Sequence, residues 1–288
     1  MPTAKLILTG LLMLLCCTIA FGQKTDITLK EIDLHNYYKQ YDLDGMFALY
    51  DPEIKVLYIY NKKYFNRQTT PASTFNITTS LICLEEQILK DENSLIGYDG
   101  YHRSRYQSQN KDIPLELAFK RNIDWAFFIL RKKLGQHKLK QWVDKLNFGN
   151  RQIPAQFDSL RILNNKTDTF WVVPGTLRVT PAQQLKYVEQ LKNETLPFSK
   201  QNLRTVKAMM LLKDSAGMKI SGKQGSYPLL GENKYIGWHI GWIEKAGKTM
   251  FYVNYLQSQD MKHPTIGAAQ KEITFKIFEN IDKYIRFE

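Results

Sequence analysis

Ser73 is the residue whose type and setting first suggest covalent chemistry. It follows Pro71-Ala72 and opens an apolar-periodic run with helical spacing, so we expect it at the N-terminus of a helix. A serine hydroxyl is a poor nucleophile unless an adjacent base removes its proton. Three residues on, Asn76 carries an amide, which has no useful basicity at neutral pH. Nucleophilic chemistry at Ser73 would therefore need a base from elsewhere in the chain.

Two further segments place polar side chains beside a glycine. Phe148-Gly149-Asn150 interrupts a helical pattern, and Lys223-Gln224-Gly225 follows a predicted strand. The glycine of the second segment lets a ligand approach the backbone, and its lysine supplies a positive charge. The histidines show no metal-ligand spacing, and we predict neither a metal nor a cofactor. They are His35, His102, His137, His239 and His263.

Strands are predicted near both ends of the chain. Residues 45–51 and 54–60 are expected to form a hairpin around Asp51-Pro52. A second hairpin is expected around Gly247. The C-terminal strands are predicted at 218–221, 235–244 and 249–255.

Helices are predicted between these strands. The run after Pro71 extends to about residue 87, and two helical patterns follow between 115 and 146, the first ending at Gly135. Thr180 before a proline predicts another helix start. A last helix is expected over about 268–284. Strands at both ends with helices between them indicate an α+β fold whose terminal strands pair in one sheet.

The first 22 residues have the pattern of a signal peptide. Lys5 precedes an apolar run over 6–15 that is too short to favour a membrane span, and Ala20-Phe21-Gly22 forms a small-residue exit before Gln23. We therefore expect export, a single mature domain over 23–288 and no stable membrane span after cleavage. A retained N-terminal anchor is the alternative.

Cysteine usage gives the expected mature chain no disulfide. Cys16 and Cys17 leave with the signal peptide, so Cys83 remains alone. Leu14-Leu15 before Cys16 lacks the small residue typical of a lipoprotein signal.

The formal net charge of +12 is spread along the 288 residues, with acidic residues interspersed. Nucleic-acid binding would require a basic stripe with base-stacking aromatic residues, and the sequence shows neither. We therefore predict no nucleic-acid partner. The charge serves either as a solvated surface or as attraction to an anionic envelope or small anionic substrates.

Several motifs in one order resemble the class D β-lactamases and the related sensor domains of β-lactam-responsive receptors, within the penicillin-recognising serine hydrolases. The motifs are Pro71-Ala72-Ser73-Thr74-Phe75, Tyr98-Asp99-Gly100, Phe148-Gly149-Asn150, Phe170-Trp171, Lys223-Gln224-Gly225 and 235–242. The resemblance implies a β-lactamase/transpeptidase-like fold, in which an antiparallel sheet packs against helices and a helical subdomain stands beside it. It covers nearly all of the chain after residue 22.

The resemblance also implies that Ser73 is the nucleophile. In this family the lysine three residues later is carbamylated, and its new carboxylate takes the serine proton and later activates water. This chain has Asn76 at that position. Loss of a general base typically lowers a rate by about two to four powers of ten, so hydrolysis is expected to be impaired.

The second family motif, serine-any-valine, falls on Asn122-Ile123-Asp124 when its spacing is counted back from Phe148. Asn122 thus replaces the proton-shuttling serine, and a carboxylate replaces a valine that leans toward the carbamylated lysine. We hypothesise that Asp124 substitutes for the carbamate and that Asn76 orients it by a hydrogen bond. The alternative is a packed polar contact in a site without chemistry.

The remaining resemblance implies the substrate contacts. Phe148, Asn150, Lys223, Gln224 and Gly225 take the places of the tyrosine-glycine-asparagine and lysine-threonine-glycine motifs. Backbone N–H groups of Ser73 and Ser226 would form the oxyanion hole. Trp171 stands for a tryptophan that braces the carbamate, or is a core residue. The family's carboxylate-binding arginine falls on Ile266 or Gly267.

Three functions are compatible with these residues. The first is a penicillin-binding, class D β-lactamase-like serine protein that acts on β-lactams or peptidoglycan-like peptides with impaired hydrolysis. The second is a catalytically inactive envelope binding or sensor module, which either stays acylated or binds without covalent chemistry. The third is an envelope protein that keeps the fold only as a scaffold. All three imply a bacterial, periplasmic protein.

Overall fold

The computed structural model describes residues 26–153, 177–215, 217–229, 232–260 and 266–285. Its main element is a seven-stranded sheet in the order β1-β3-β2-β9-β8-β7-β6. The strands are β1 Thr28–Glu31, β2 Asp44–Asp51, β3 Val56–Tyr60, β6 Leu211–Ser215, β7 Met218–Leu229, β8 Lys234–Lys245 and β9 Lys248–Ser258. Only β1 and β3 pair in parallel among these strands, and the other neighbours are antiparallel. A two-stranded sheet, β4 Leu95–Ile96 and β5 Ile113–Pro114, lies apart from it.

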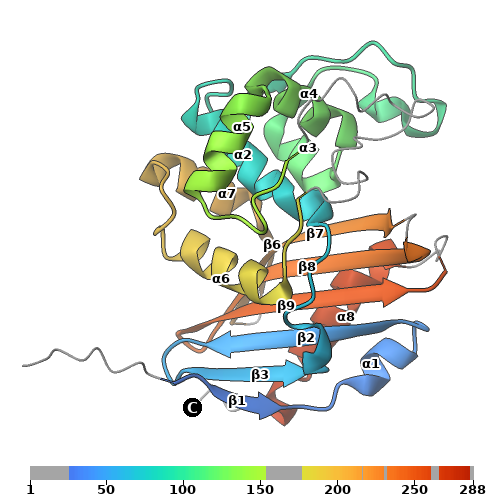
Figure 1. Ribbon diagram of the computed structural model, residues 1–288, viewed down its shortest axis with the longest axis vertical. Helices are drawn as coiled ribbons and strands as arrows, with labels where there is room; N and C mark the ends of the chain where they lie inside the picture. Colours follow the sequence, from blue (N-terminus) through green and yellow to red (C-terminus); the bar gives the residue numbers. More distant parts are fainter. Residues whose placement is uncertain (1–25, 154–176, 216, 230–231, 261–265, 286–288) are drawn as a thin grey trace, which may run out of the picture.

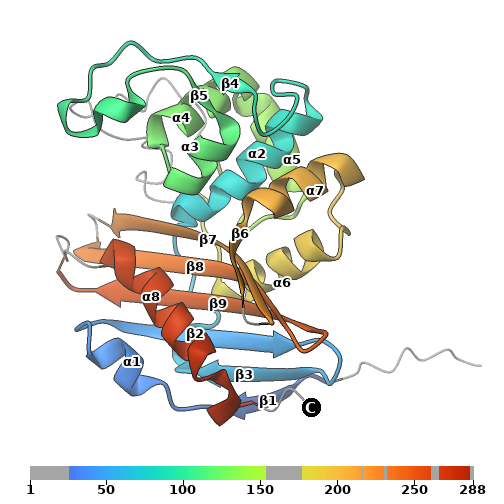
Figure 2. The ribbon, with the colours of Figure 1, turned by 180° about the vertical axis from the view of Figure 1, so that it is seen from behind.

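The helices divide between the two faces of the large sheet (Figures 1 and 2). On one face lie α1 His35–Lys39 and α8 Ile266–Glu279. On the other lie α2 Asn76–Glu85, α3 Leu115–Arg121, α4 Asp124–Leu134, α5 Gln136–Lys145, α6 Pro181–Lys192 and α7 Lys200–Met209. Short 3₁₀ turns are η1 Lys62–Tyr64, η2 Ala72–Phe75, η3 Ser104–Gln109 and η6 Ile281–Lys283. The fold is α+β, as predicted.

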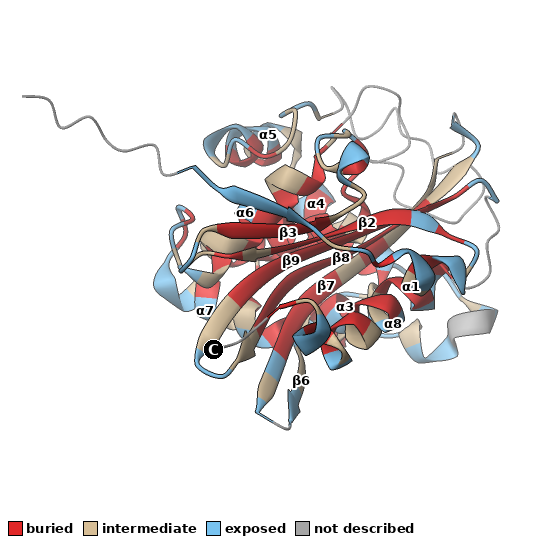
Figure 3. Cartoon of the chain, turned by 90° about the horizontal axis from the view of Figure 1, so that it is seen from below, coloured by how far each residue is buried: buried red, intermediate tan, exposed pale blue. Residues whose placement is uncertain are grey.

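Helices on both faces explain the composition of the central strands. Residues 236–243 of β8 and 250–258 of β9 are buried throughout, because each face of these strands packs on a helical layer (Figure 3). Even-numbered β8 residues such as Trp238 and Trp242 join the core on the α2–α7 side, whereas Ile243 joins the core under α8. The sheet thus separates two hydrophobic cores.

Both predicted hairpins are confirmed. β2 pairs antiparallel with β3, and β8 pairs with β9 from Lys245 opposite Lys248. Ala246 and Gly247 between them have φ of +50° and +78°, which suits a two-residue turn whose twist matches that of the strands. The pairing of β2 with β9 confirms that strands from the two ends of the chain share one sheet.

The predicted Thr180 helix start is also confirmed. The Thr180 side chain accepts a hydrogen bond from the backbone of Gln183, and the Gln183 side chain accepts one from the Thr180 backbone. This reciprocal capping box satisfies two N–H groups that the helix itself leaves unpaired. The proline at the first helical position adds a preset φ.

Three predicted boundaries are wrong. Between 115 and 146 the chain forms three helices instead of two, because Asn122 adopts a left-handed φ of +50° and ends α3. The strand predicted at 218–221 continues to Leu229, since its polar residues are held by pairing with β8 along the whole length. The last helix lies at Ile266–Glu279, followed by a separate turn at Ile281–Lys283. The elements β1, β4, β5, β6, α1 and α7 were not predicted from the sequence.

Candidate active site

The Ser73 turn lies where the helical layer meets the sheet. η2 continues directly into α2 and packs against β7 and β8. Ala72 has a left-handed φ of +47°, and its N–H donates to the Thr70 hydroxyl at 3.3 Å. The Thr74 hydroxyl donates to the Pro71 carbonyl at 2.6 Å. These bonds hold a tight turn in which Ser73 alone keeps a partly exposed surface, while Ala72 and Thr74 are buried.

Gly225 of β7 allows this close approach of turn and strand. A Cβ atom on residue 225 would lie 2.7 Å from the Ser73 nitrogen and 2.8 Å from the Thr74 nitrogen, closer than real Cβ atoms come. Only glycine lets the serine backbone lie so near the strand. The structure therefore brings Ser73 and Lys223-Gln224-Gly225 together, although 150 residues of chain separate them.

The backbone of β7 directs the Ser226 N–H toward the same region. The Gln224 carbonyl accepts from the Asn122 side chain at 3.3 Å, while the Gly225 N–H donates to Gln270 Oε1 of α8 at 3.2 Å. Neighbouring residues in a strand direct their backbone groups to opposite edges. Ser226 therefore shares the edge of Gln224. The Ser73 nitrogen lies against Gly225, the residue before Ser226, which is compatible with the predicted oxyanion hole.

Asn122 and Lys223 are in direct contact. The Lys223 ammonium donates to the Asn122 side-chain oxygen, and its nitrogen lies 4.8 Å from the centre of the Phe119 ring. The left-handed conformation of Asn122 at the end of α3 turns its side chain toward β7. Asn122, the position found by counting back from Phe148, therefore does contact the strand that contains Lys223.

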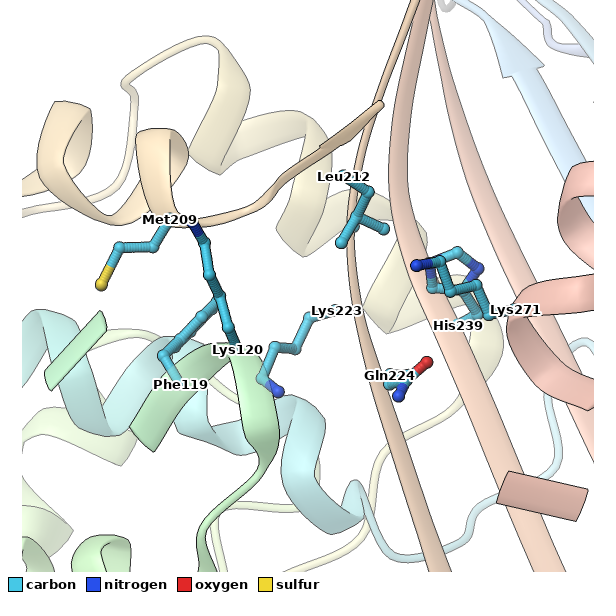
Figure 4. A pocket seen from close by; sticks show the side chains of 9 residues that line it. Phe119, Lys120, Met209, Leu212, Lys223, Gln224, His239 and Lys271 are labelled. Atoms are coloured by element: carbon cyan, nitrogen blue, oxygen red, sulfur yellow. The ribbon is translucent and has the colours of Figure 1, made fainter. Parts of the chain in front are cut away.

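A small pocket lies at this edge of β7 (Figure 4). Its lining residues are Phe119, Lys120, Met209, Leu212, Gly222, Lys223, Gln224, His239 and Lys271. Lys223 extends from β7 toward Phe119 of α3, whereas Gln224 and His239 lie on the other side of the strand. The side chains of the predicted lysine-containing motif therefore face two environments.

Asn76 is buried beside a cation that the sequence analysis missed. Its side-chain oxygen accepts from Arg131 Nη1 of α4 at 3.3 Å, and both residues are 3% exposed. Burial lowers the pKa of Arg131 to about 9, and the nearby Asp124 charge opposes that change. Arg131 therefore remains charged at neutral pH. A fixed positive charge thus stands against the position where the family has its lysine.

Asp124 lies at the start of α4 with Arg131 two turns along the same helix. Desolvation raises the pKa of Asp124, and the charges of Arg131 and Lys223 counter it. The Asp124 surface is nevertheless exposed, so water weakens the desolvation and we take the group as a carboxylate at neutral pH. In the part of the chain that the structure describes, no hydrogen bond joins Asp124 to Asn76. The Asp124 base hypothesis stays a prediction, with Arg131 as its charged neighbour.

Phe148 lies next to the Ser73 turn, and the side chains of Phe148 and Asn150 are both held by contacts within the protein. Phe148 is buried and packs edge-on against Phe75, next to Ser73. The Asn150 side-chain oxygen accepts from the Arg178 backbone at 2.9 Å. Gly149, with φ of +57°, has no room for a Cβ because the Arg178 carbonyl would lie 2.1 Å away. Their roles toward a ligand stay predictions.

The remaining predictions concern Trp171, the signal peptide, the expected arginine position and metal or membrane binding. Trp171 and the signal peptide lie outside the described residues. Ile266 is buried at the start of α8 and Gly267 is exposed, so these positions supply no cation. Among the described residues, no cluster of three His, Cys, Asp or Glu could hold a metal ion. No helix in the same part of the chain is long and apolar enough to cross a membrane.

Two missed residues leave a recognisable pattern in the sequence. Arg131 is a charged residue on the apolar face of its helix, seven positions after Asp124, which is about two helical turns. Gln270 of α8 accepts from both Gly225 and Trp238 of adjacent strands, at 3.2 and 3.1 Å. A buried polar residue on an amphipathic helix can be found by periodicity, but its partner cannot.

The fold and the site together define a class of protein. The family model for the penicillin binding protein transpeptidase domain matches residues 23–281. The chain therefore belongs to the penicillin-binding transpeptidase domain family, and its class D β-lactamase resemblance is confirmed.

Individual relatives agree with this. The chain is 29% identical over 239 residues to the probable β-lactamase YbxI of Bacillus subtilis, covering 83% of this chain and 81% of the relative. It is 26% identical to the regulatory protein BlaR1 of Bacillus licheniformis over 86% of this chain, but it spans only 38% of that longer protein.

Solved structures show the same likeness. A class D β-lactamase from Bacillus subtilis is 27% identical, with a TM-score of 0.73 over 88% of this chain and 98% of that one. The C-terminal domain of the Bacillus licheniformis BlaR penicillin-receptor gives a TM-score of 0.76 at 24% identity, over 90% and 98% of the two chains. The second likeness concerns the fold alone.

Proposed function

We propose that this protein binds β-lactams or peptidoglycan-like peptides and is acylated at Ser73, with slow release of the acyl group. One observation carries the proposal: the Ser73 turn lies against β7 so closely that only glycine fits at 225, with the Lys223–Asn122 contact two residues away. We propose that Ser73 as nucleophile, the backbone N–H groups of Ser73 and Ser226, and the buried Lys223 form one site. The name of one relative, a probable β-lactamase, supports the same ligand class.

Slow release follows from the residues around position 76. An amide cannot activate water, and Arg131 occupies the neighbourhood with a fixed positive charge. Among the described residues we assign this role to Asp124, whose exposed surface leaves it accessible to water. We therefore propose that acylation exceeds hydrolysis.

The second candidate is a sensor or binding module that forms no covalent bond. The Asn76–Arg131 contact favours it, because it replaces the family's base by a neutral amide bonded to a cation. In either case we propose export to the periplasm, on the strength of the N-terminal sequence. The ligand would be a small molecule.

Intact-mass spectrometry with benzylpenicillin tests the proposal. The protein without residues 1–22 is incubated with the drug for hours, beside Ser73→Ala. A Ser73-dependent adduct that persists supports the acylated binding protein, and hydrolysed drug accumulating without adduct supports a β-lactamase. If neither forms, while the drug still raises the melting temperature, the non-covalent module is correct.

A further inference from the structure

Lys223 is a buried lysine that contacts no carboxylate of the described residues. Lys223 is 3% exposed. Its Nζ donates a hydrogen bond to the Asn122 side-chain oxygen and lies over the Phe119 ring. Among the described residues no carboxylate oxygen lies within the 4.0 Å of an ion pair, and Asp124 acts on it only as a more distant charge. A buried ammonium lacking an ion pair is costly. Burial therefore favours the neutral amine, whereas the Asn122 oxygen and the Phe119 ring stabilise the ammonium, so both forms are accessible.

The pKa agrees with this geometry. Burial lowers the pKa of Lys223 to about 7, while the Asp124 charge raises it. A substantial fraction of the side chain is thus a free amine near neutral pH. Such an amine has a lone pair that can accept a proton.

Lys223 also projects on the correct face of β7. Residues two apart in a strand point to the same face, so Lys223 and Gly225 share one. The Cβ direction at Gly225 leads straight to the Ser73 and Thr74 nitrogens. The lysine therefore extends on the strand face that carries the serine turn.

We infer that the neutral amine of Lys223 takes the proton of Ser73 during acylation, in place of the base that the family has at position 76. The inference rests on the proposed function. The Ser73 O–H bond breaks, its proton goes to Nζ, and Oγ bonds to the carbonyl carbon. The carbonyl electron pair moves to the oxygen, beside the Ser73 and Ser226 N–H groups. When the pair returns and the C–N bond breaks, the Lys223 ammonium gives its proton to the leaving nitrogen.

Other titratable and charged groups lie near Lys223 or near Asp124. Lys120 of α3, His239 of β8 and Lys271 of α8 line the same pocket as Lys223. Asp124 of α4 acts on Lys223 as a charge, and Arg131 of α4 acts on Asp124. Lys120 is paired with Glu116. Burial, together with the Lys271 and Lys223 charges, lowers the pKa of His239 to about 3, so it stays neutral. Asp124 is therefore the group whose removal changes Lys223 most directly.

The experiment measures the acylation rate constant with benzylpenicillin from pH 5 to 9, by quenched intact-mass spectrometry. We compare the wild type with Lys223→Arg, Lys223→Ala and Asp124→Asn, each checked by circular dichroism and thermal unfolding. Arginine keeps the positive charge that would hold a substrate carboxylate, but it holds its proton far more strongly than lysine. It thus separates a base from an anion-binding residue.

We expect wild-type acylation to rise with pH through an apparent pKa near 7. Asp124→Asn removes the negative charge that raises the pKa of Lys223. The rise of the acylation rate with pH should therefore occur at lower pH in this variant. Lys223→Arg lowers the rate about 100-fold or more, and ethylamine restores part of the loss in Lys223→Ala. If the lysine variants do not fold, the test is the pH dependence of acylation in the wild type and its shift to lower pH in Asp124→Asn.

Two results overturn the inference while leaving the proposed function intact: acylation of Lys223→Arg at the wild-type rate, or loss of acylation across the whole pH range in Asp124→Asn. The second result would identify Asp124 as the base. If the wild type forms no adduct at any pH, the proposed covalent function fails, and the role of Lys223 fails with it.

Discussion

Gly225→Ala is the substitution that most directly tests how the site is assembled. The added Cβ would lie 2.7 Å from the Ser73 nitrogen, where ordinary contacts begin at 3.4 Å. The obstacle is backbone, held by the Thr74–Pro71 hydrogen bonds, and cannot rotate away. Turn and strand must separate by roughly 0.7 Å, the difference between these two distances.

That separation sets the expected magnitude. A displacement approaching 1 Å in a catalytic arrangement costs about 100-fold in rate, so we expect acylation by benzylpenicillin to fall roughly 30- to 100-fold. The free energy of unfolding should fall by about 1–3 kcal/mol, as for other overpacked sites. The fall in the acylation rate should be larger than the fall in the folded fraction calculated from the measured free energy of unfolding.

The assay is the acylation rate constant from intact-mass spectrometry, with the free energy of unfolding from urea denaturation. Gly97→Ala is the matched control, because a Cβ there would meet nothing within 4 Å. It should leave the acylation rate unchanged. Wild-type acylation in Gly225→Ala would refute the reasoning, since the glycine would then not set the distance between Ser73 and β7.

Three other predictions concern stability, each measured by urea or thermal unfolding. Because burial lowers the pKa of His239 to about 3, whereas the unfolded chain protonates near 6.5, the free energy of unfolding should fall as the pH drops through this range, by about 1.4 kcal/mol per pH unit. His239→Phe should not show this decrease. Equal pH dependence of the free energy of unfolding in the wild type and the variant would contradict the prediction. Asn76→Lys adds a second buried cation next to Arg131 and should cost about 3 kcal/mol. Asn76→Lys/Arg131→Met should recover most of that loss, and equal stability of the two variants would argue against charge repulsion. Thr180→Ala removes half of the capping box and should cost about 1 kcal/mol, and an unchanged melting temperature would show that the cap is dispensable.

The sequence by itself determined what depends on near neighbours in the chain. The turn between β8 and β9, the Thr180 cap and the hydrophobic strands follow from residue types within a few positions. The order of the motifs was enough to indicate the family, and the match over residues 23–281 confirmed it. Even the position of Asn122 was reached by counting along the chain. These features are local or serial, so a linear sequence contains them.

Only the tertiary structure decided which distant residues meet. This holds for Arg131 beside Asn76 and for Gln270 beneath Gly225, because both depend on how helices pack on the sheet. It also holds for Lys223, which contacts no carboxylate of the described residues. Such contacts join segments from tens of residues to about 100 residues apart, and periodicity shows that a side chain faces inward without showing what it faces. The ionisation of Lys223 follows from burial, which is a property of the packed molecule. The serine could be found in the sequence, but the groups that govern its proton could not.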